Sequence, residues 1–216
     1  MKSLTKNFLN DSEKKQVEAA VEAAEKRTSG EIVPMIVSSS YGYPMADVIG
    51  ASAFALPVSV VLTVVIGGML WIGTRDMWLF MGIFAVFFAG FHLLIKHLLW
   101  LKRWFISKRE IEEEVQEAAV TAFYQNGLFR TRDETGVLIF ISVFERRVWV
   151  LADRGIDEKV PQDSWKGVVD MITIGIRENR AAEAICGAVE TVGDMLARHF
   201  PIKSDDTNEL KNLIIE

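Results

Sequence analysis

Acidic residues gather in two short stretches of the chain, one just before and one just after a pair of apolar, β-branched runs. The four of them are Asp133, Glu134, Asp153 and Asp157. Carboxylate oxygens brought together in loops are the ligands that a hard cation such as Ca²⁺ or Mg²⁺ prefers. Arg132 and Arg154 flank the same carboxylates and allow a second interpretation, in which exposed ion pairs form that contribute little energy. Spacing alone favours the ion pairs and leaves the metal site as the alternative.

The two apolar runs decide whether these loops meet. Gly136–Phe144 and Arg147–Ala152 are rich in Val, Ile, Leu and aromatic residues, which indicates two strands. A two-residue turn at Glu145–Arg146 would place Leu138 opposite Asp153 in an antiparallel pair. The loop before the first strand and the loop after the second are therefore expected at one end of the sheet. Because the apolar character is nearly continuous, we expect helices to cover both faces.

Other catalytic chemistry finds no support in the sequence. Nucleophile elbows, phosphate-binding glycine loops and zinc-binding histidine pairs are absent. Cys186 is the only cysteine, which excludes an internal disulfide, and its Ala-rich helical surroundings indicate a small buried hydrophobe. Ser38–Ser40, at the end of a predicted strand, is interpreted as part of a turn and not as a source of a nucleophile.

Two uncharged apolar runs in the first half of the chain are long enough to cross a membrane. They are Val48–Gly73, of 26 residues, and Met77–Ile95, of 19 residues, and only Thr74–Asp76 separates them. A helix rises about 1.5 Å per residue and a hydrocarbon core is roughly 30 Å thick. The sequence therefore predicts a transmembrane helical hairpin, and with it an integral protein of the cell membrane that is bound to the lipid bilayer.

Basic residues beside the hairpin predict its orientation. Lys and Arg concentrate in short cytoplasmic flanks. The turn offers only Arg75, beside Asp76, whereas five basic residues follow the second run: Lys96, Lys102, Arg103, Lys108 and Arg109. Both termini are therefore expected in the cytoplasm. His92 and Lys96, one helical turn apart, raise the alternative of a small transporter subunit. A lone hairpin has no repeat and encloses no pore, which makes that alternative the weakest.

The remaining elements complete an α/β fold. A capping box at Asn10–Glu13 predicts an N-terminal helix, and Glu31–Ser39, with Pro34 inside it, predicts an edge strand. The expected architecture is a small mixed sheet sandwiched between helices, with the two-helix hairpin inserted. Apolar residues at helical spacing predict further helices over 107–125, 162–176 and 180–199. The expected parts are residues 1–46 and 106–201 for the soluble domain, 47–105 for the hairpin and 202–216 for a loose polar tail.

The net charge of the chain is −5, and the acidic excess lies after Phe105. Affinity for nucleic acid depends on Lys and Arg side chains that neutralise phosphates. An acidic soluble part therefore argues against a nucleic-acid partner.

The segment from Leu128 to Val148, with its Thr-Gly-Val-Leu and Glu-Arg-Arg-Val motifs, resembles the TPM domain. Asp153–Ile156, Ser29–Ile32 and Ala197–Pro201 fit the same family, and the resemblance covers residues 6–43 and 106–201. The family takes its name in part from thylakoid-lumen photosystem-maintenance proteins and is often labelled phosphatase-like. In some members acidic residues bind a divalent cation, which for this chain implies a metal site at Asp133, Glu134, Asp153 and Asp157. The inserted hairpin departs from the lumenal relatives, whose anchor usually lies outside the fold.

Two hypotheses of function follow. The preferred one is an accessory or interaction module for other membrane proteins, held at the bilayer and acting in their maintenance; homo-oligomerisation is compatible with it. The alternative is a divalent-cation-dependent phosphatase in which Asp153 is the candidate catalytic residue. In that hypothesis the metal ligands are Asp133, Glu134, Asp153 and Asp157. Members of the family differ in whether they show phosphatase activity, so the resemblance does not decide between the two.

Overall fold

The computed structural model describes residues 4–70, 76–203 and 208–216. The chain forms two compact units. The first contains the residues up to Tyr41 together with Glu112–Glu216, and the second contains Gly42–Ile111. Thr74 and Arg75, in the predicted hairpin turn, lie outside the described residues.

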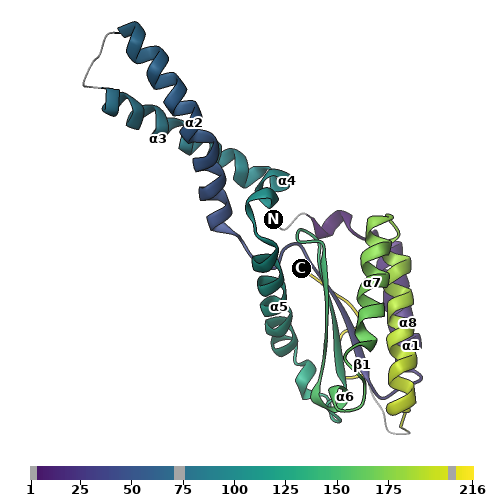
Figure 1. Ribbon diagram of the computed structural model, residues 1–216. Helices are drawn as coiled ribbons and strands as arrows, with labels where there is room; N and C mark the ends of the chain where they lie inside the picture. Colours follow the sequence, from purple (N-terminus) through teal and green to yellow (C-terminus); the bar gives the residue numbers. More distant parts are fainter. Residues whose placement is uncertain (1–3, 71–75, 204–207) are drawn as a thin grey trace. The chain divides into compact units, whose positions relative to one another are not determined.

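A four-stranded mixed sheet forms the centre of the first unit (Figure 1). Its order is β3-β2-β1-β4, and β1 is parallel to β2 over its whole length, whereas β3 is antiparallel to β2. Segments on either side of the hairpin therefore form one sheet, which confirms the mixed α/β class predicted from the sequence. The strands are β1 at Glu31–Val37, β2 at Gly136–Ser142, β3 at Arg147–Ala152 and β4 at Ile214–Ile215.

Pro34 occupies the side of β1 that turns away from β2. The Glu31 N–H donates to Thr135 on the β2 side, whereas the Ile32 N–H donates to the Glu25 carboxylate on the other side. Because backbone groups alternate along a strand, Pro34 shares the outer side with Ile32. β1 lies between β2 and β4 and is not the edge strand that the sequence predicts. β4 contacts it only from Met35 onward, so the missing N–H of Pro34 removes no ladder bond.

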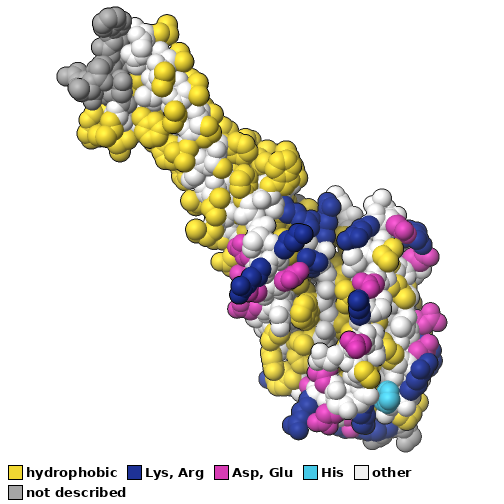
Figure 2. All heavy atoms as spheres, in the orientation of Figure 1, with side chains coloured by type: hydrophobic (Ala, Val, Ile, Leu, Met, Phe, Trp, Pro, Cys, Tyr) yellow, Lys and Arg dark blue, Asp and Glu magenta, His cyan; other side chains and the backbone are white. Residues whose placement is uncertain are grey.

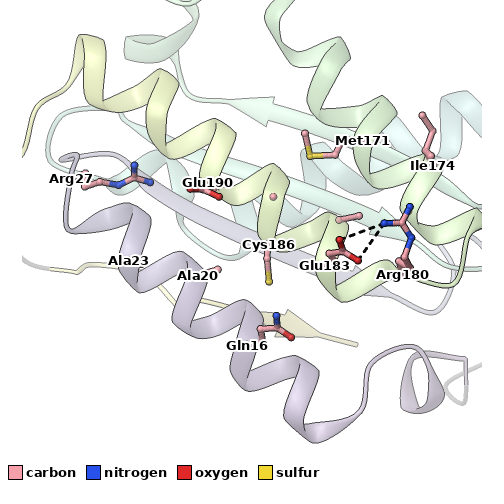
Figure 3. Close-up of a pocket in the computed structure, with 13 residues that line it drawn as sticks. Gln16, Ala20, Ala23, Arg27, Met171, Ile174, Arg180, Glu183, Cys186 and Glu190 are labelled. Atoms are coloured by element: carbon pink, nitrogen blue, oxygen red, sulfur yellow. Dashed lines mark hydrogen bonds and ion pairs between the residues drawn. The ribbon is translucent and has the colours of Figure 1, made fainter.

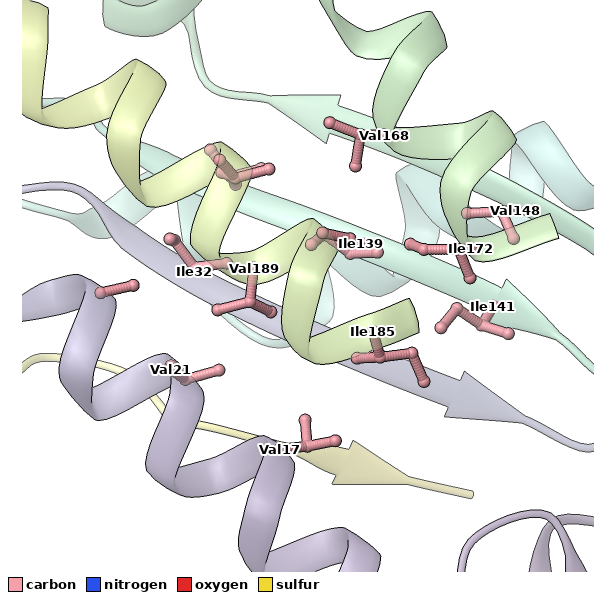
Figure 4. Close-up of a cluster of buried hydrophobic side chains, with 14 of the residues drawn as sticks. Val17, Val21, Ile32, Ile139, Ile141, Val148, Val168, Ile172, Ile185 and Val189 are labelled. Atoms are coloured by element: carbon pink, nitrogen blue, oxygen red, sulfur yellow. The ribbon is translucent and has the colours of Figure 1, made fainter. Parts of the chain in front are cut away.

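Three helices cover one face of the sheet: α1 at Asp11–Glu25, α7 at Ser164–Arg177 and α8 at Ala181–His199. α1 begins with the predicted capping box, in which Asn10 and Glu13 each accept a backbone N–H of the other. Burial of an aliphatic side chain contributes about 1.5–3 kcal/mol, so this face carries much of the stability. The side chains that meet there include Val17, Val21, Ile32, Ile139, Ile141, Val168, Ile172, Ile185 and Val189 (Figure 4).

Helix α5, at Lys108–Gln125, lies on the opposite side of the sheet (Figure 1). Val115, Ala119 and Phe123 of this helix are buried, as are Leu138 and Phe140 of β2, which alternate with the residues that face α7 and α8. Both faces of the sheet are therefore covered, as its apolar strands predict. Short helical turns complete the two units: η1 at Thr5–Asn7, α4 at Leu99–Lys102, η3 at Arg103–Phe105, η4 at Leu128–Arg130 and α6 at Arg154–Asp157.

The register of β2 and β3 differs by two residues from the expected one. Arg147 lies opposite Ser142 and not opposite Phe144, and Leu138 lies opposite Leu151. The turn therefore has four residues where two were predicted. A shift of two keeps every side chain on its expected face of the sheet, so the acidic loops still reach the same end.

A buried carboxylate explains this longer turn. Glu145 is fully buried and accepts hydrogen bonds from the hydroxyls of Ser142 and Ser39 and from the N–H of Ser40. A buried carboxylate needs such donors. The side chain of Glu145 therefore turns inward to the end of β1, and it cannot occupy the tip of a tight two-residue hairpin.

The second unit consists mainly of two long helices, α2 at Pro44–Leu70 and α3 at Asp76–His97. Both are long and apolar enough to cross a membrane, over Pro44–Met69 and Met77–His97. Only 22% of the apolar stretch of α2 and 6% of that of α3 are buried, whereas the core helix of a soluble protein is mostly buried. Figure 2 shows hydrophobic side chains over these helices, and Lys, Arg, Asp and Glu side chains spread over the other unit.

A close contact and a buried ion pair join the helices of this second unit. A Cβ on Gly50 would lie 2.7 Å from Ile95 Cδ1, so a larger residue would force that side chain to move. Lys102 Nζ lies 2.8 Å from Asp47 Oδ2 and 2.7 Å from the Gly42 carbonyl oxygen, and both charged side chains are buried. Removing one member of a buried pair costs about 3–5 kcal/mol because the other charge stays behind. Lys102 therefore fixes the start of α2 against α4.

The C-terminal segment is not the loose tail that the sequence predicts, at least over its last nine residues, 208–216. The Glu216 N–H donates to Ile36 and the Ser38 N–H donates to Glu216, which extends the sheet beside β1. Leu213 and Ile215 pack against the core. The free outer edge of β1 beyond Pro34 gives this short apolar segment a strand to pair with. The sequence alone does not predict this pairing.

Two neighbouring carboxylates hold the beginning of this segment. Glu25 accepts a hydrogen bond from the Asn208 amide at 3.1 Å, and Glu31 accepts one from the Glu209 N–H at 3.1 Å. Burial raises the pKa of Glu25 to about 8; the Ile32 N–H opposes this shift and the charge of Glu31 adds to it. Glu25 is therefore protonated in the folded protein at neutral pH.

This raised pKa predicts a loss of stability as pH increases. Glu25 ionises near its ordinary value of 4.5 in the unfolded chain and near about 8 in the folded chain, so its contribution is full below 4.5 and disappears as pH rises through 8. Glu25→Gln should remove much of the fall in melting temperature between pH 5 and pH 8 in detergent-solubilised protein. Glu18→Gln, two helical turns away on the exposed side of α1 and not among the charges that shift Glu25, should retain the wild-type slope; equal slopes for Glu25→Gln and wild type would contradict the assignment.

Candidate functional site

The two acidic loops meet beside α6, at the end of the sheet where β2 begins and β3 ends. Asp153 caps α6, since its Oδ1 accepts the Arg154 N–H at 2.8 Å, and its own N–H donates to the Gly136 carbonyl at 2.8 Å. One residue further on, the Gly155 N–H donates to the Glu134 carbonyl at 3.1 Å. The convergence predicted from the strand pair is thus present despite the changed register.

Glycine is needed where these loops touch. A Cβ on Gly155 would lie 2.7 Å from the Glu134 carbonyl oxygen and 2.9 Å from that of Asp133, and a Cβ on Gly136 would lie 2.5 Å from the Leu128 carbonyl oxygen. Glu134 has a positive φ of 55°, a left-handed conformation that non-glycine residues adopt rarely. The backbone carbonyls of Asp133 and Glu134 are therefore held against the first turn of α6.

Asp153 and Asp157 form the electrostatic centre of this site. Asp153 Oδ2 is buried and has no hydrogen-bond partner among the described residues. Burial and, after it, the charge of Asp153 raise the pKa of Asp157. The two carboxylates thus repel each other across one turn of α6 at an incompletely solvated position, and a cation or a proton would relieve that repulsion.

The ion-pair interpretation holds for only part of the site. Asp133 Oδ2 lies 2.6 Å from Lys203 Nζ and 3.8 Å from Arg132 Nε, so this carboxylate is already neutralised from two sides. Arg154 Nε, by contrast, lies 3.0 Å from Glu158 Oε1. Lys203 is a site residue that sequence spacing does not suggest, because it comes from the segment after α8.

A cation would therefore meet a smaller set of ligands than the predicted one. Among residues 4–70, 76–203 and 208–216, no three or more His, Cys, Asp or Glu side chains gather in a metal-binding arrangement. Ca²⁺ also accepts backbone carbonyl oxygens, and those of Asp133 and Glu134 lie against Gly155 of α6. A divalent-cation site, in this reduced form or with all four carboxylates, stays a prediction.

A second feature of the first unit is a groove of about 1000 Å³ between α1, α7 and α8 (Figure 3). Its two arginines are paired within the unit, Arg27 with Asp194 and Arg180 with Glu183. Burial raises the pKa of the Cys186 thiol, which keeps it protonated and makes it a poor nucleophile. The groove has the character of a surface between helices and lacks catalytic groups; the small residues that line it include Ala20, Ala23, Ala184, Cys186 and Gly187.

Comparison with known proteins agrees with the fold and with the sequence motifs. Residues 104–195 match the family model described as the TPM domain; this part runs from η3 to α8 and includes the whole acidic site. This part of the chain is therefore similar to the TPM domain, in agreement with the motifs around Gly136 and Asp153. No curated protein matches the chain.

A solved structure has the same overall fold. It is the NMR structure of BA42 protein from the psychrophilic bacterium Bizionia argentinensis, with a TM-score of 0.60 and 20% sequence identity, covering 97% of each chain. At this identity the likeness concerns the fold alone.

The loop contact at Gly155 can be tested by adding one methyl group. Gly155→Ala should destabilise the folded protein by about 1–3 kcal/mol, because its Cβ must displace two backbone oxygens. Gly167→Ala is the matched control: it lies inside α7 with nothing within 4 Å, and it should stabilise by roughly 0.5–1 kcal/mol through helix propensity. Chemical denaturation of both variants measures the difference. Equal effects of the two substitutions would show that the loops do not pack as described.

Proposed function

We propose that this protein is a membrane-anchored TPM-domain module that acts as an accessory or interaction partner of other membrane proteins, in a role such as their maintenance. The observation that carries the proposal is the exposure of α2 and α3, of which only 22% and 6% of the apolar stretches are buried. Stable proteins in water rarely expose so large a continuous apolar surface. A lipid bilayer supplies the missing contacts.

The path of the chain supports a role at the membrane surface. The hairpin is inserted after β1 and before α5, within a domain whose strands β1 and β2 pair along their full length. The TPM domain is thereby connected to the bilayer at two points, Gly42 and Ile111. Two connections restrict the distance over which the domain can move, which suits contacts with proteins in the same membrane.

The proposed location is the cell membrane, with both termini in the cytoplasm. Basic residues after α3 support this orientation. Lys102 is bound to Asp47, but Lys96 in the last turn of α3 and Arg103, Lys108 and Arg109 after it remain at this end of the hairpin. The far end of the hairpin has only Arg75.

Proximity labelling tests the accessory role. The full chain, with a biotin ligase fused to it, is compared with residues 42–111 carrying the same ligase, which are the hairpin without the TPM domain. The full chain should label a defined set of integral membrane proteins that the hairpin alone does not label. If both fusions label the same proteins in the same proportions, the domain recruits nothing and the proposed function fails.

A second candidate function is a divalent-cation-dependent phosphatase, with Asp153 as its candidate catalytic residue. The partnerless Asp153 Oδ2 and the raised pKa of Asp157 support it. Ca²⁺ or Mg²⁺ would be held by Asp153 and Asp157, with Asp133 and Glu134 as the remaining predicted ligands. Such an ion, when bound, supplies a positive charge that can polarise a phosphate oxygen.

Calorimetric titration with Ca²⁺ and with Mg²⁺ tests this second function. The wild-type chain should bind one of the ions, and Asp153→Asn should reduce the affinity at least tenfold, since it removes a charged ligand. Glu158→Gln, on the exposed side of α6, is the matched control and should bind like wild type. Absence of heat with both ions, or an unchanged affinity in Asp153→Asn, would eliminate the candidate.

A further inference from the structure

The outer edge of β3 presents unpaired backbone groups. The Asp153 N–H donates to Gly136, and in an antiparallel ladder every second residue bonds to the same neighbour. The register then pairs Leu151 with Leu138 and Trp149 with Phe140 as hydrogen-bonded residues. The N–H and C=O groups of the intervening residues point away from β2. These residues are Val148, Val150 and Ala152.

No partner for these outward groups exists among the residues that the structure describes. The opposite edge of the sheet is different, because β4 and the Glu25 carboxylate occupy the outer side of β1. β3 also lacks the proline or bulge that protects many edge strands. An open edge of this kind is a site for the addition of another strand.

A groove of about 500 Å³ runs along this edge. α5 forms one wall through Val120, and α7 forms the other through Trp165 and Val169. The floor is the edge strand itself, from Val148 to Ala152. The groove is therefore shaped for an extended chain, with hydrogen bonds along its floor and apolar contacts at its sides.

The charges at the two ends of β3 identify the occupant. Arg147 and Asp153 lie three residues before and three residues after Val150. If the same strand from another copy ran antiparallel about Val150, Arg147 of each copy would lie opposite Asp153 of the other. Arg147 is 43% exposed beside Glu112, and Asp153 as a residue is half-buried. Opposite charges facing each other across strands are stabilising.

Neighbouring registers neither place Arg147 opposite Asp153 nor pair all three outward residues with one another. Centring the pair on Trp149 would place Arg147 opposite Leu151, and centring it on Leu151 would place Arg147 opposite Gly155. Only the register about Val150 also pairs all three outward residues with one another, Val150 with its counterpart and Val148 with Ala152. The pattern is self-complementary, as a two-fold interface requires.

We infer that the β3 edge is the interface for a second copy of this chain, which pairs antiparallel about Val150 and joins the two sheets into one. This interface joins copies of the same chain, whereas the proposed function concerns contacts with other membrane proteins. It therefore stands or falls independently of the proposed function.

Site-specific disulfides test both the contact and its register. In a non-hydrogen-bonded antiparallel pair the Cα atoms are about 4.5 Å apart, within the usual disulfide range of roughly 4.4–6.8 Å. In the inferred register Trp149 of one copy faces Leu151 of the other. Full chains with Trp149→Cys and with Leu151→Cys, each in a Cys186→Ala background and with different tags, are co-expressed and oxidised in mild detergent.

The main oxidised product should be a disulfide-linked dimer that carries both tags. Each variant expressed alone is its own control and should remain largely uncrosslinked, because like residues lie about two positions apart along the strands, roughly 7 Å. Crosslinking of Trp149→Cys with itself, or no mixed product, would overturn the inference. Light scattering should give the wild-type chain a mass of two copies in the micelle; a single copy, or a different polypeptide crosslinked at Trp149→Cys, would also overturn it.

Discussion

The parallel pairing of β1 with β2 is the constraint on which the rest of the structure depends. It joins Glu31–Val37 to Gly136–Ser142 across the whole inserted hairpin. The ends of the insertion must therefore return to one place, which an even number of membrane crossings allows and a single crossing forbids. Two exposed apolar helices satisfy this condition. The acidic site depends on the same pairing, because the Glu31 N–H binds Thr135 directly beside the loop that carries Asp133 and Glu134.

Much of the fold could be predicted from local patterns. The capping box at Asn10, the apolar periodicity of α5, α7 and α8, and the β-branched runs of β1 to β3 each depend on residues close in sequence. The predictions of the β2–β3 turn and of the C-terminal tail were wrong because residues distant in sequence determine both structures. Glu145 lengthens the hairpin because it binds Ser39 and Ser40 at the end of β1. The C-terminal strand β4 forms because β1 has a free edge beyond Pro34. The local sequence of neither segment predicts that they pair.

The candidate site was predictable in position and not in detail. The strand pair determines that the loops around Asp133 and Asp153 meet. Gly155 allows their backbones to approach closely because it has no Cβ. Lys203 neutralises Asp133 from a segment after α8, a contact that requires the whole tertiary fold. As a result the four carboxylates are not equivalent: Asp133 has a cationic partner, whereas Asp153 and Asp157 are left to face each other. That remaining pair is where a cation would have its largest effect.

The claim that one domain is folded across a membrane hairpin is tested most directly by the sidedness of three residues. Single cysteines replace Glu18 in α1, Met77 in α3 and Lys166 in α7, in a Cys186→Ala chain reconstituted with uniform orientation in sealed vesicles. An impermeant maleimide is applied from outside, before and after lysis. Glu18→Cys and Lys166→Cys should label from one side and Met77→Cys only from the other. Labelling of Glu18→Cys and Lys166→Cys from opposite sides, or of all three from one side, would contradict the account.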